Sequence, residues 1–256
     1  MRFLKRFYTF IIFFFLYAPI IVLMIFSFNN SKSRAKWDGF TFKWYAELFR
    51  DSEILSSLYY TVIIAVISSL VATVIGTIAA IGIHNMSKVK KNIVMNLTYL
   101  PVINPDIVTG ISLMILFIYA KLNLGFVTLL LAHITFNIPY VILSVMPKLK
   151  QMNKHVYEAA LDLGATPLHA FWKVILPEIM PGVVTGALLA FTLSLDDFVI
   201  SFFTTGSGVS NLSITIYSMA RRGINPKINA LSTIMFITVL LLLIVVNKRT
   251  SRKENA

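Results

Sequence analysis

The chain has 256 residues, of which 57% are hydrophobic and only 13% are charged, and its formal net charge is +12. A soluble domain carries about twice that share of charged residues, so the composition places the chain in a membrane. The basic residues gather at the ends of apolar runs, a pattern that membrane topology requires and that argues against nucleic-acid binding. The absence of cysteine excludes disulfides and thiolate metal sites.

Six apolar stretches have about the 20-residue length that crosses the hydrocarbon core of a bilayer. We therefore expect an all-α, polytopic membrane protein with six transmembrane helices in a single domain over residues 1–256. The first span lacks a small-residue cleavage site, which indicates an uncleaved anchor. The third contains Pro101, Pro105 and Asp106, which predicts a broken span. The predicted spans are residues 8–28, 59–83, 93–119, 125–146, 180–203 and 230–246.

The orientation of the chain follows from its short loops, because Lys and Arg in such loops stay on the cytoplasmic side. Basic residues cluster at positions 2–6, 88–91, 148–154 and 248–253. These clusters lie on one side of the six predicted spans. We therefore expect a multi-pass protein of the cytoplasmic membrane, with both termini and residues 147–179 in the cytoplasm.

The cytoplasmic segment between the fourth and fifth spans has the pattern of a helical hairpin. Residues 153–163 carry apolar side chains at three-and-four spacing, which predicts a helix. Gly164 is suited to end that helix, and Thr166 followed by Pro167 is typical of the start of a second one. Periodicity alone leaves two roles open: a docking site for another protein, or an amphipathic hairpin lying on lipid headgroups.

A longer motif runs through this segment and resembles the EAA loop of ABC-importer permeases. It consists of Glu158, Ala159, Ala160, Gly164, Val174, Leu176 and Pro177, and Val174 stands where Ile is usual. Three further segments are similar to permeases of the spermidine/putrescine importer group, of the PotC type. They are GFTFKWYAELF at 39–49, SLDDFVISFFTTG at 194–206 and IYSMARRGINPKINALSTI at 216–234. The resemblance covers nearly the whole chain.

This resemblance implies a type I ABC-importer permease, of MetI-like fold, that moves polyamines into the cytoplasm and is not an enzyme. It implies several partners: two copies of a cytosolic ABC ATPase, a second related permease subunit, an external polyamine-binding protein and membrane lipid. The chain lacks GxxxxGK[ST], so ATP and Mg²⁺ belong to the ATPase and this chain binds no cofactor. The implied coupling residues are Glu158, Ala159, Ala160, Leu161, Asp162, Leu163, Gly164, Leu176 and Pro177.

A polycation crossing the membrane must meet carboxylates and ring faces, because an unpaired charge there is costly. The candidate pathway residues are Asp106, Asp196, Asp197 and Phe198. Asp106 follows Asn104 and Pro105, so its alternative role is to stabilise the start of a half-helix. Adjacent residues on one helix point about 100° apart, so Asp196 and Asp197 cannot both face one spot. Their alternative place is the outer membrane surface, if the span ends early.

Other functions remain open on this sequence. A permease for ferric ion, sulfate or a sugar would look similar, although the carboxylates disfavour anions. A membrane enzyme or a proton-coupled carrier would need a catalytic dyad, a metal cluster or a proton relay, and the spacing of the His and Asp residues provides none. We expect His133, the one histidine inside a predicted span, to bond to a neighbouring carbonyl. We expect Gly76 and the alanines around it to form a close helix-packing face.

Overall fold

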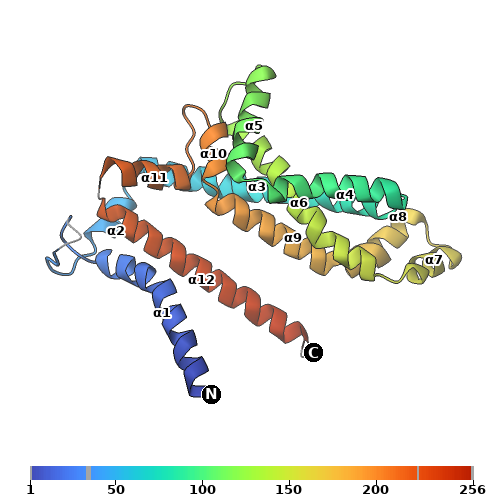
Figure 1. Ribbon diagram of the computed structural model, residues 1–256, viewed down its shortest axis with the longest axis horizontal. Helices are drawn as coiled ribbons and strands as arrows, with labels where there is room; N and C mark the ends of the chain where they lie inside the picture. The colour runs from blue at the N-terminus through green and yellow to red at the C-terminus, as the bar shows by residue number, and fades with distance from the viewer. Residues whose placement is uncertain (1, 33–35, 224, 255–256) are drawn as a thin grey trace. The chain divides into compact units, whose positions relative to one another are not determined.

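The computed structural model describes residues 2–32, 36–223 and 225–254, so the two ends of the predicted domain, at residues 1 and 255–256, lie outside it. Within these ranges the fold is helical, with one isolated bridge between Asn29 and Phe40 (Figure 1). The predicted all-α class is confirmed. The elements are α1 (Arg2–Phe26), α2 (Lys43–Leu48), α3 (Ser52–His84), α4 (Lys88–Ile103), α5 (Asp106–Tyr119), α6 (Phe126–Gln151), α7 (Lys154–Asp162), α8 (Pro167–Ala170), the π-helix η1 (Phe171–Ile175), α9 (Leu176–Asp196), α10 (Val199–Thr204), α11 (Leu212–Arg222) and α12 (Pro226–Glu254).

Most of the predicted spans correspond to helices that can cross a membrane. In the described residues these are Lys5–Phe26, Ser52–His84, Phe126–Gln151 and Pro167–Asp196. The helices α4 and α5 pass the same test as a pair, bent by 105°. The sixth predicted span falls in α12, where Pro226–Leu241 is a shorter apolar helix and residues 242–246 are described by their backbone only.

The break in the third span lies at Asn104 and Pro105, as predicted. Proline lacks an N–H and disfavours helical geometry in the residue before it. Asn104 is accordingly extended, with φ −68° and ψ 144°, and α5 begins directly after Pro105. The proline therefore ends one helix and starts another in a new direction, which Figure 1 shows as the upright α5 beside α4.

The fifth predicted span, residues 180–203, is not one continuous helix, because it breaks at Asp197. Helix α9 ends at Asp196, Asp197 is extended with φ −60° and ψ 127°, and α10 begins at Val199. The physical reason is a cap: the Asp197 carboxylate accepts hydrogen bonds from the backbone N–H groups of Ile200 at 3.3 Å and Ser201 at 2.7 Å. Such a side chain satisfies the first donors of a new helix.

The chain divides into two compact units, Ser57–Ile214 and Met1–Ser56 with Thr215–Ala256, and each is described by itself. A single domain over residues 1–256 stays a prediction. In the first unit α6 packs along α9, and small residues permit the close approach. A Cβ on Gly76 of α3 would lie 2.7 Å from Val141 Cβ, and one on Gly186 of α9 would lie 3.1 Å from Val141 Cα. Ala72 and Ala80 are fully buried, so the predicted packing face of α3 is confirmed.

In the second unit α12 packs against α1 and α2. The buried Trp44 of α2 donates from Nε1 to the backbone oxygen of Asn29 at 2.7 Å. The buried side chain of Asn29 in turn donates to Lys36 O and accepts from Asp38 N. One tryptophan and one asparagine thus tie the loop after α1 to the short helix α2.

Candidate functional site

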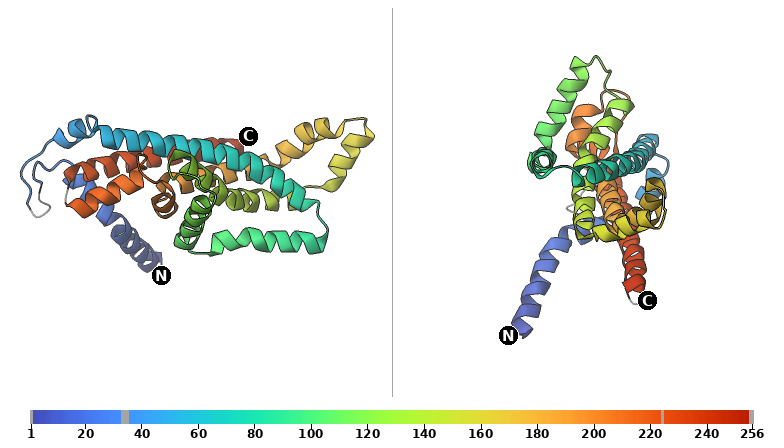
Figure 2. Two further views of the ribbon diagram at one scale, coloured as in Figure 1. Left: turned by 90° about the horizontal axis from the view of Figure 1, so that it is seen from above. Right: turned by 90° about the vertical axis from the view of Figure 1, so that its right-hand side faces the viewer.

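The α7–α8 hairpin, residues 153–175, extends beyond the ends of α6 and α9 within its unit (Figures 1 and 2). The Asn153 side chain caps α7 by accepting the His155 N–H at 3.0 Å. At the other end, Gly164 N–H donates to Leu161 O at 2.9 Å and Ala165 N–H donates to Ala160 O at 3.0 Å. These two bonds form a Schellman motif, which needs a left-handed residue, and Gly164 has φ +86°. The predicted end of the first helix is confirmed.

The second helix of the hairpin also begins where the sequence predicts. The Thr166 hydroxyl accepts the His169 N–H at 3.3 Å, and Pro167 occupies the first helical turn. The π-helix η1 then connects α8 to α9, an element that the sequence did not predict. Because η1 runs into α9 without a break, Pro177 lies directly after the π turn within the continuous helical segment Pro167–Asp196.

The hairpin presents apolar side chains to its surroundings. Leu163 is 90% exposed, and Leu168 and Trp172 are also exposed. The Glu158 carboxylate is exposed at the rim, 3.3 Å from His155 Nδ1. A hollow of about 580 Å³ lies on this hairpin and is lined by Ala160, Leu163, Gly164, Ala165, Thr166, His169, Ala170, Lys173 and Val174. Such a surface, with an apolar centre and a polar rim, is suited to contact with another protein.

The predicted coupling residues fall into two groups. Glu158 to Gly164 form the last turns and the cap of α7, and the exposed members are Glu158, Ala159, Asp162, Leu163 and Gly164. Ala160 and Leu161 are partly buried against the rest of the hairpin. Leu176 and Pro177 instead begin α9, so they belong to the root of the hairpin.

The predicted pathway carboxylates have different environments. Asp106 is exposed in the first turn of α5, as its helix-starting role predicts. Asp196 is exposed at the last position of α9, whereas the neighbouring Asp197 side chain is only 8% exposed. The expectation that these two lie 100° apart on one helix is wrong, because the helix ends between them. Phe198 is partly buried, with its ring 5.5 Å from that of Phe202.

The structure brings two of these regions together, since α5 packs against α10. The helix that Asp106 opens therefore lies beside the helix that Asp197 caps. The close approach is at Gly110, where a Cβ would lie 3.1 Å from Phe203 Cδ2 and 3.4 Å from Ile200 Cα.

Sequence reasoning missed the partners of His133. The imidazole bonds to the hydroxyls of Ser194 and Ser201 and lies 3.6 Å from the Asp197 carboxylate, rather than bonding to a neighbouring carbonyl. The nearest of these partners is 61 positions away in the chain, so no local pattern could have indicated them.

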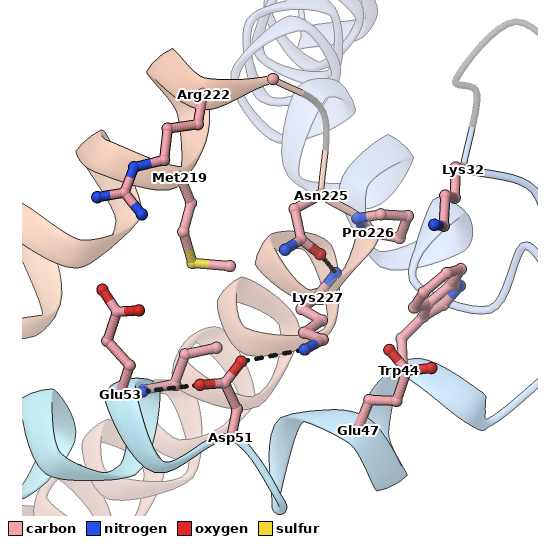
Figure 3. Close-up of a pocket in the computed structure, with 12 residues that line it drawn as sticks. Lys32, Trp44, Glu47, Asp51, Glu53, Met219, Arg222, Asn225, Pro226 and Lys227 are labelled. Carbon is pink, nitrogen blue, oxygen red and sulfur yellow. Dashed lines mark hydrogen bonds and ion pairs between the residues drawn. The ribbon is translucent and has the colours of Figure 1, made fainter.

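A second cavity, of about 490 Å³, lies in the unit that contains both ends of the chain (Figure 3). Met219 points between Arg222 and Glu53 on its walls, and Lys227 donates to the Asp51 carboxylate at 3.0 Å. Partial burial acts to raise the pKa of Asp51, but hydrogen bonds from Lys227 and from the backbone of Ile54 outweigh it, so this pKa lies below its ordinary value. The cavity is lined by Lys32, Trp44, Glu47, Asp51, Glu53, Ile54, Met219, Arg222, Gly223, Asn225, Pro226 and Lys227.

Several apolar spans, a broken third span and a projecting hairpin with the EAA spacing define a membrane component of an importer. The chain belongs to the family described as binding-protein-dependent transport system inner membrane component, which matches residues 72–248. It is therefore a multi-pass inner membrane permease and not an enzyme. Membership implies an ATPase and a solute-binding protein as partners.

Three similar relatives cover nearly the same length as this chain. Identity is 38% over 253 residues with the spermidine/putrescine transport system permease protein PotC of Haemophilus influenzae, covering 99% of this chain and 98% of the relative. It is 40% over 230 residues with PotC of Escherichia coli K12, covering 90% and 87%. It is 40% over 228 residues with the putrescine transport system permease protein PotI of the same strain, covering 86% and 81%.

Solved structures of ABC importers share the fold. A bacterial alginate ABC transporter in complex with its alginate-bound periplasmic protein matches with a TM-score of 0.72 and 19% identity, covering 97% of this chain and 93% of that one. The inward-facing MetNI methionine ABC transporter matches with a TM-score of 0.62 and 18% identity, covering 78% and 94%. The predicted type I, MetI-like permease fold is confirmed.

Proposed function

We propose that this chain is a transmembrane subunit of an ATP-driven importer that moves polyamines, spermidine or putrescine, into the cytoplasm. One observation carries the proposal: an exposed apolar hairpin with the EAA spacing stands in a chain that is 38% identical, over 99% of its length, to a permease named for these polyamines. The alginate and methionine importers share only the fold, so they do not argue for their own solutes here.

The α7–α8 hairpin is the proposed contact with a cytosolic ATPase. The exposed Leu163 supplies apolar contact area at the tip, and the Schellman motif at Gly164 gives the hairpin a fixed bend. ATP hydrolysis can drive transport only if the ATPase binds the inward-facing and outward-facing permease with different affinities. A rigid hairpin meets this need because movement of its tip is passed to α6 and α9. Two ATPase copies would carry the ATP and Mg²⁺.

The remaining partners follow from the same proposal. A second related permease subunit completes the pathway, and both termini of this chain lie in the cytoplasm. The segments that line the 490 Å³ cavity then face outward, where an external polyamine-binding protein delivers its solute. The mixed charge of that lining, with three carboxylates and three basic side chains, is suited to a polar protein contact.

Within the proposed pathway, Asp196 is the best-placed ligand for an ammonium group. Its carboxylate is exposed, while both oxygens of Asp197 already accept backbone hydrogen bonds. Asp106 opens the neighbouring helix α5 and adds a second exposed carboxylate. Phe198, two positions after Asp196, supplies a partly buried ring. Two separated carboxylates match a solute with amines at both ends.

Uptake in proteoliposomes tests the proposal. The complete transporter is reconstituted with its binding protein at the outer face of the permease. It is then given labelled spermidine, putrescine or ferric ion. We expect ATP-dependent uptake of the polyamines and none of ferric ion. Uptake of ferric ion alone, or polyamine uptake that is indifferent to ATP, contradicts the proposal.

Crosslinking tests the hairpin separately. Because the chain contains no cysteine, no native cysteine has to be replaced before a new one is introduced. A Leu163→Cys variant is expected to crosslink to the ATPase. Leu122→Cys serves as the matched control, because this exposed leucine lies in the loop between α5 and α6. If Leu163→Cys reacts with lipid-borne probes and never with the ATPase, the hairpin lies on the headgroups instead.

A further inference from the structure

A buried imidazole bridges the break between α9 and α10. His133 of α6 is 2% exposed, and its two ring nitrogens contact different elements. Nδ1 lies within hydrogen-bond distance of the Ser194 hydroxyl of α9, and Nε2 lies 2.9 Å from the Ser201 hydroxyl of α10. Because a hydroxyl can donate or accept, this arrangement satisfies either neutral tautomer of the ring. One side chain thus holds the end of one helix and the start of the next.

The residue at the break, Asp197, completes the bridge. One carboxylate oxygen lies 3.6 Å from His133 Nε2 and accepts the Ser201 N–H at 2.7 Å. The other oxygen accepts the Ile200 N–H at 3.3 Å. Asn211 closes the cluster from the following loop, since its Nδ2 donates to Asp197 O at 3.0 Å and to Ser201 Oγ at 2.7 Å.

This cluster has a cost that apolar side chains would avoid. A buried carboxylate and a buried imidazole each lose favourable hydration free energy, and only hydrogen bonds or ion pairs offset that loss. An unbroken apolar helix over the same residues would need neither group. The cluster therefore supports the local cap at Asp197 and stabilises a helix that ends at Asp196 and restarts at Val199.

That geometry decides where the Asp196 carboxylate lies. Because the helix ends at Asp196, its side chain stays exposed while the next carboxylate turns inward to cap α10. The backbone oxygen of Asp196 also accepts from the Ser213 hydroxyl at 3.3 Å, which anchors the end of α9 from the start of α11. Asp196 itself needs no buried partner, so it remains available to a solute.

We propose that His133 is a positioning residue for transport: through Asp197 and Ser201 it fixes the break that presents the Asp196 carboxylate to the solute. This inference rests on the proposed function of Asp196 as a pathway ligand. His133 touches no solute itself, and it acts only through the geometry of the break.

Three variants of α6 test the role of the imidazole. His133→Leu keeps approximate volume and removes both hydrogen bonds, whereas His133→Gln keeps an amide in reach of Ser201. Thr135→Val is the matched control, because Thr135 is exposed on the same helix and its hydroxyl donates to Leu131 O, at 2.8 Å. Each variant is assembled into the complete transporter with its ATPase and binding protein.

The first readout separates transport from assembly. We expect His133→Leu to lower the maximal polyamine uptake rate about tenfold. The reason is that a displaced Asp196 carboxylate would lose one contact to an ammonium group of the solute. ATP hydrolysis and the binding-protein concentration that gives half-maximal uptake should stay unchanged. His133→Gln should recover most of the uptake, and Thr135→Val should match the parent chain.

The second readout reports the position of residue 196 without depending on transport. Asp196→Cys is labelled with a cationic, membrane-impermeant thiol reagent in the parent and His133→Leu backgrounds. Ser207→Cys, exposed in the loop after α10, serves as the control. We expect His133→Leu to change the labelling rate at position 196 and not at position 207, and His133→Gln to change neither.

The two readouts distinguish the inference from the proposed function. Unchanged labelling at position 196 in His133→Leu overturns the positioning role, even if Asp196→Asn abolishes uptake. Changed labelling together with normal uptake in Asp196→Asn overturns the pathway role of Asp196, and the inference with it. If His133→Leu fails to assemble, Ser201→Ala takes its place in both readouts, with the same results expected and the same results contradicting the inference.

Discussion

The bend of the α7–α8 hairpin depends on the backbone of one residue, and Gly164→Ala tests it. Gly164 has φ +86°, and a Cβ added there would meet nothing within 4 Å. The substitution therefore causes backbone strain and no collision. A left-handed conformation costs an L-residue about 1–2 kcal/mol, which corresponds to about a 5–30-fold change in an equilibrium. We expect the affinity of the subunit for its ATPase to fall by about this factor, because docking requires the bent hairpin.

The assay is titration of the purified subunit with its ATPase, followed by ATP-driven uptake in proteoliposomes. Gly164→Asn is the first control, since asparagine tolerates the left-handed region, and it should bind nearly as the parent does. Gly82→Ala is the second, because its Cβ also meets nothing within 4 Å but it lies within α3, where alanine is favoured by about 0.5–1 kcal/mol. Normal affinity in Gly164→Ala, or equal loss in Gly82→Ala, would refute the reasoning.

Three further predictions concern other parts of the chain. Gly206→Ala should lower the thermal stability of the detergent-solubilised subunit by several degrees or prevent its folding, because φ is +66° and a Cβ would lie 2.3 Å from Leu124 O. Asp51→Asn should lower stability at pH 7 and not in acid: the pKa of Asp51 is lowered, so its ion pair with Lys227 stabilises above the ordinary value of 3.8 and is lost as pH falls through the lowered pKa. Melting curves from pH 3 to pH 7 check this, and a constant difference contradicts it. Asp196→Asn should reduce polyamine uptake while leaving the melting temperature unchanged, since its carboxylate is exposed; a loss of both would make it a structural residue.

Local signals in the sequence were sufficient where proline, glycine and capping residues determine the backbone. Pro105 predicts the break between α4 and α5, and Gly164 with Thr166 predicts both helix ends within the hairpin. Each of these residues acts through its own φ angle or through an N–H two or three positions away. The fold class and the hairpin could therefore be predicted without any tertiary contact.

The break at Asp197 was not predicted, although the Asp197 carboxylate caps the N–H groups of Ile200 and Ser201, which is a local signal. No proline or glycine lies between Asp196 and Val199, and an apolar run through this segment favours one continuous helix. The break is held by His133 and Asn211, which approach Asp197 only in the folded chain. Tertiary contacts add to local propensity here, and so the sequence could predict that Asp196 and Asp197 face different ways but not which of the two is buried.

The π-helix Phe171–Ile175 takes up one residue at the base of the hairpin. A π turn contains one residue more than the α turn that it replaces, so it completes about the same rotation with a longer piece of chain. Deleting one residue here and restoring α geometry would therefore leave the hairpin pointing in nearly the same direction. The same deletion within the regular α-helix of α9 would instead rotate the hairpin by about 100° relative to the rest of α9.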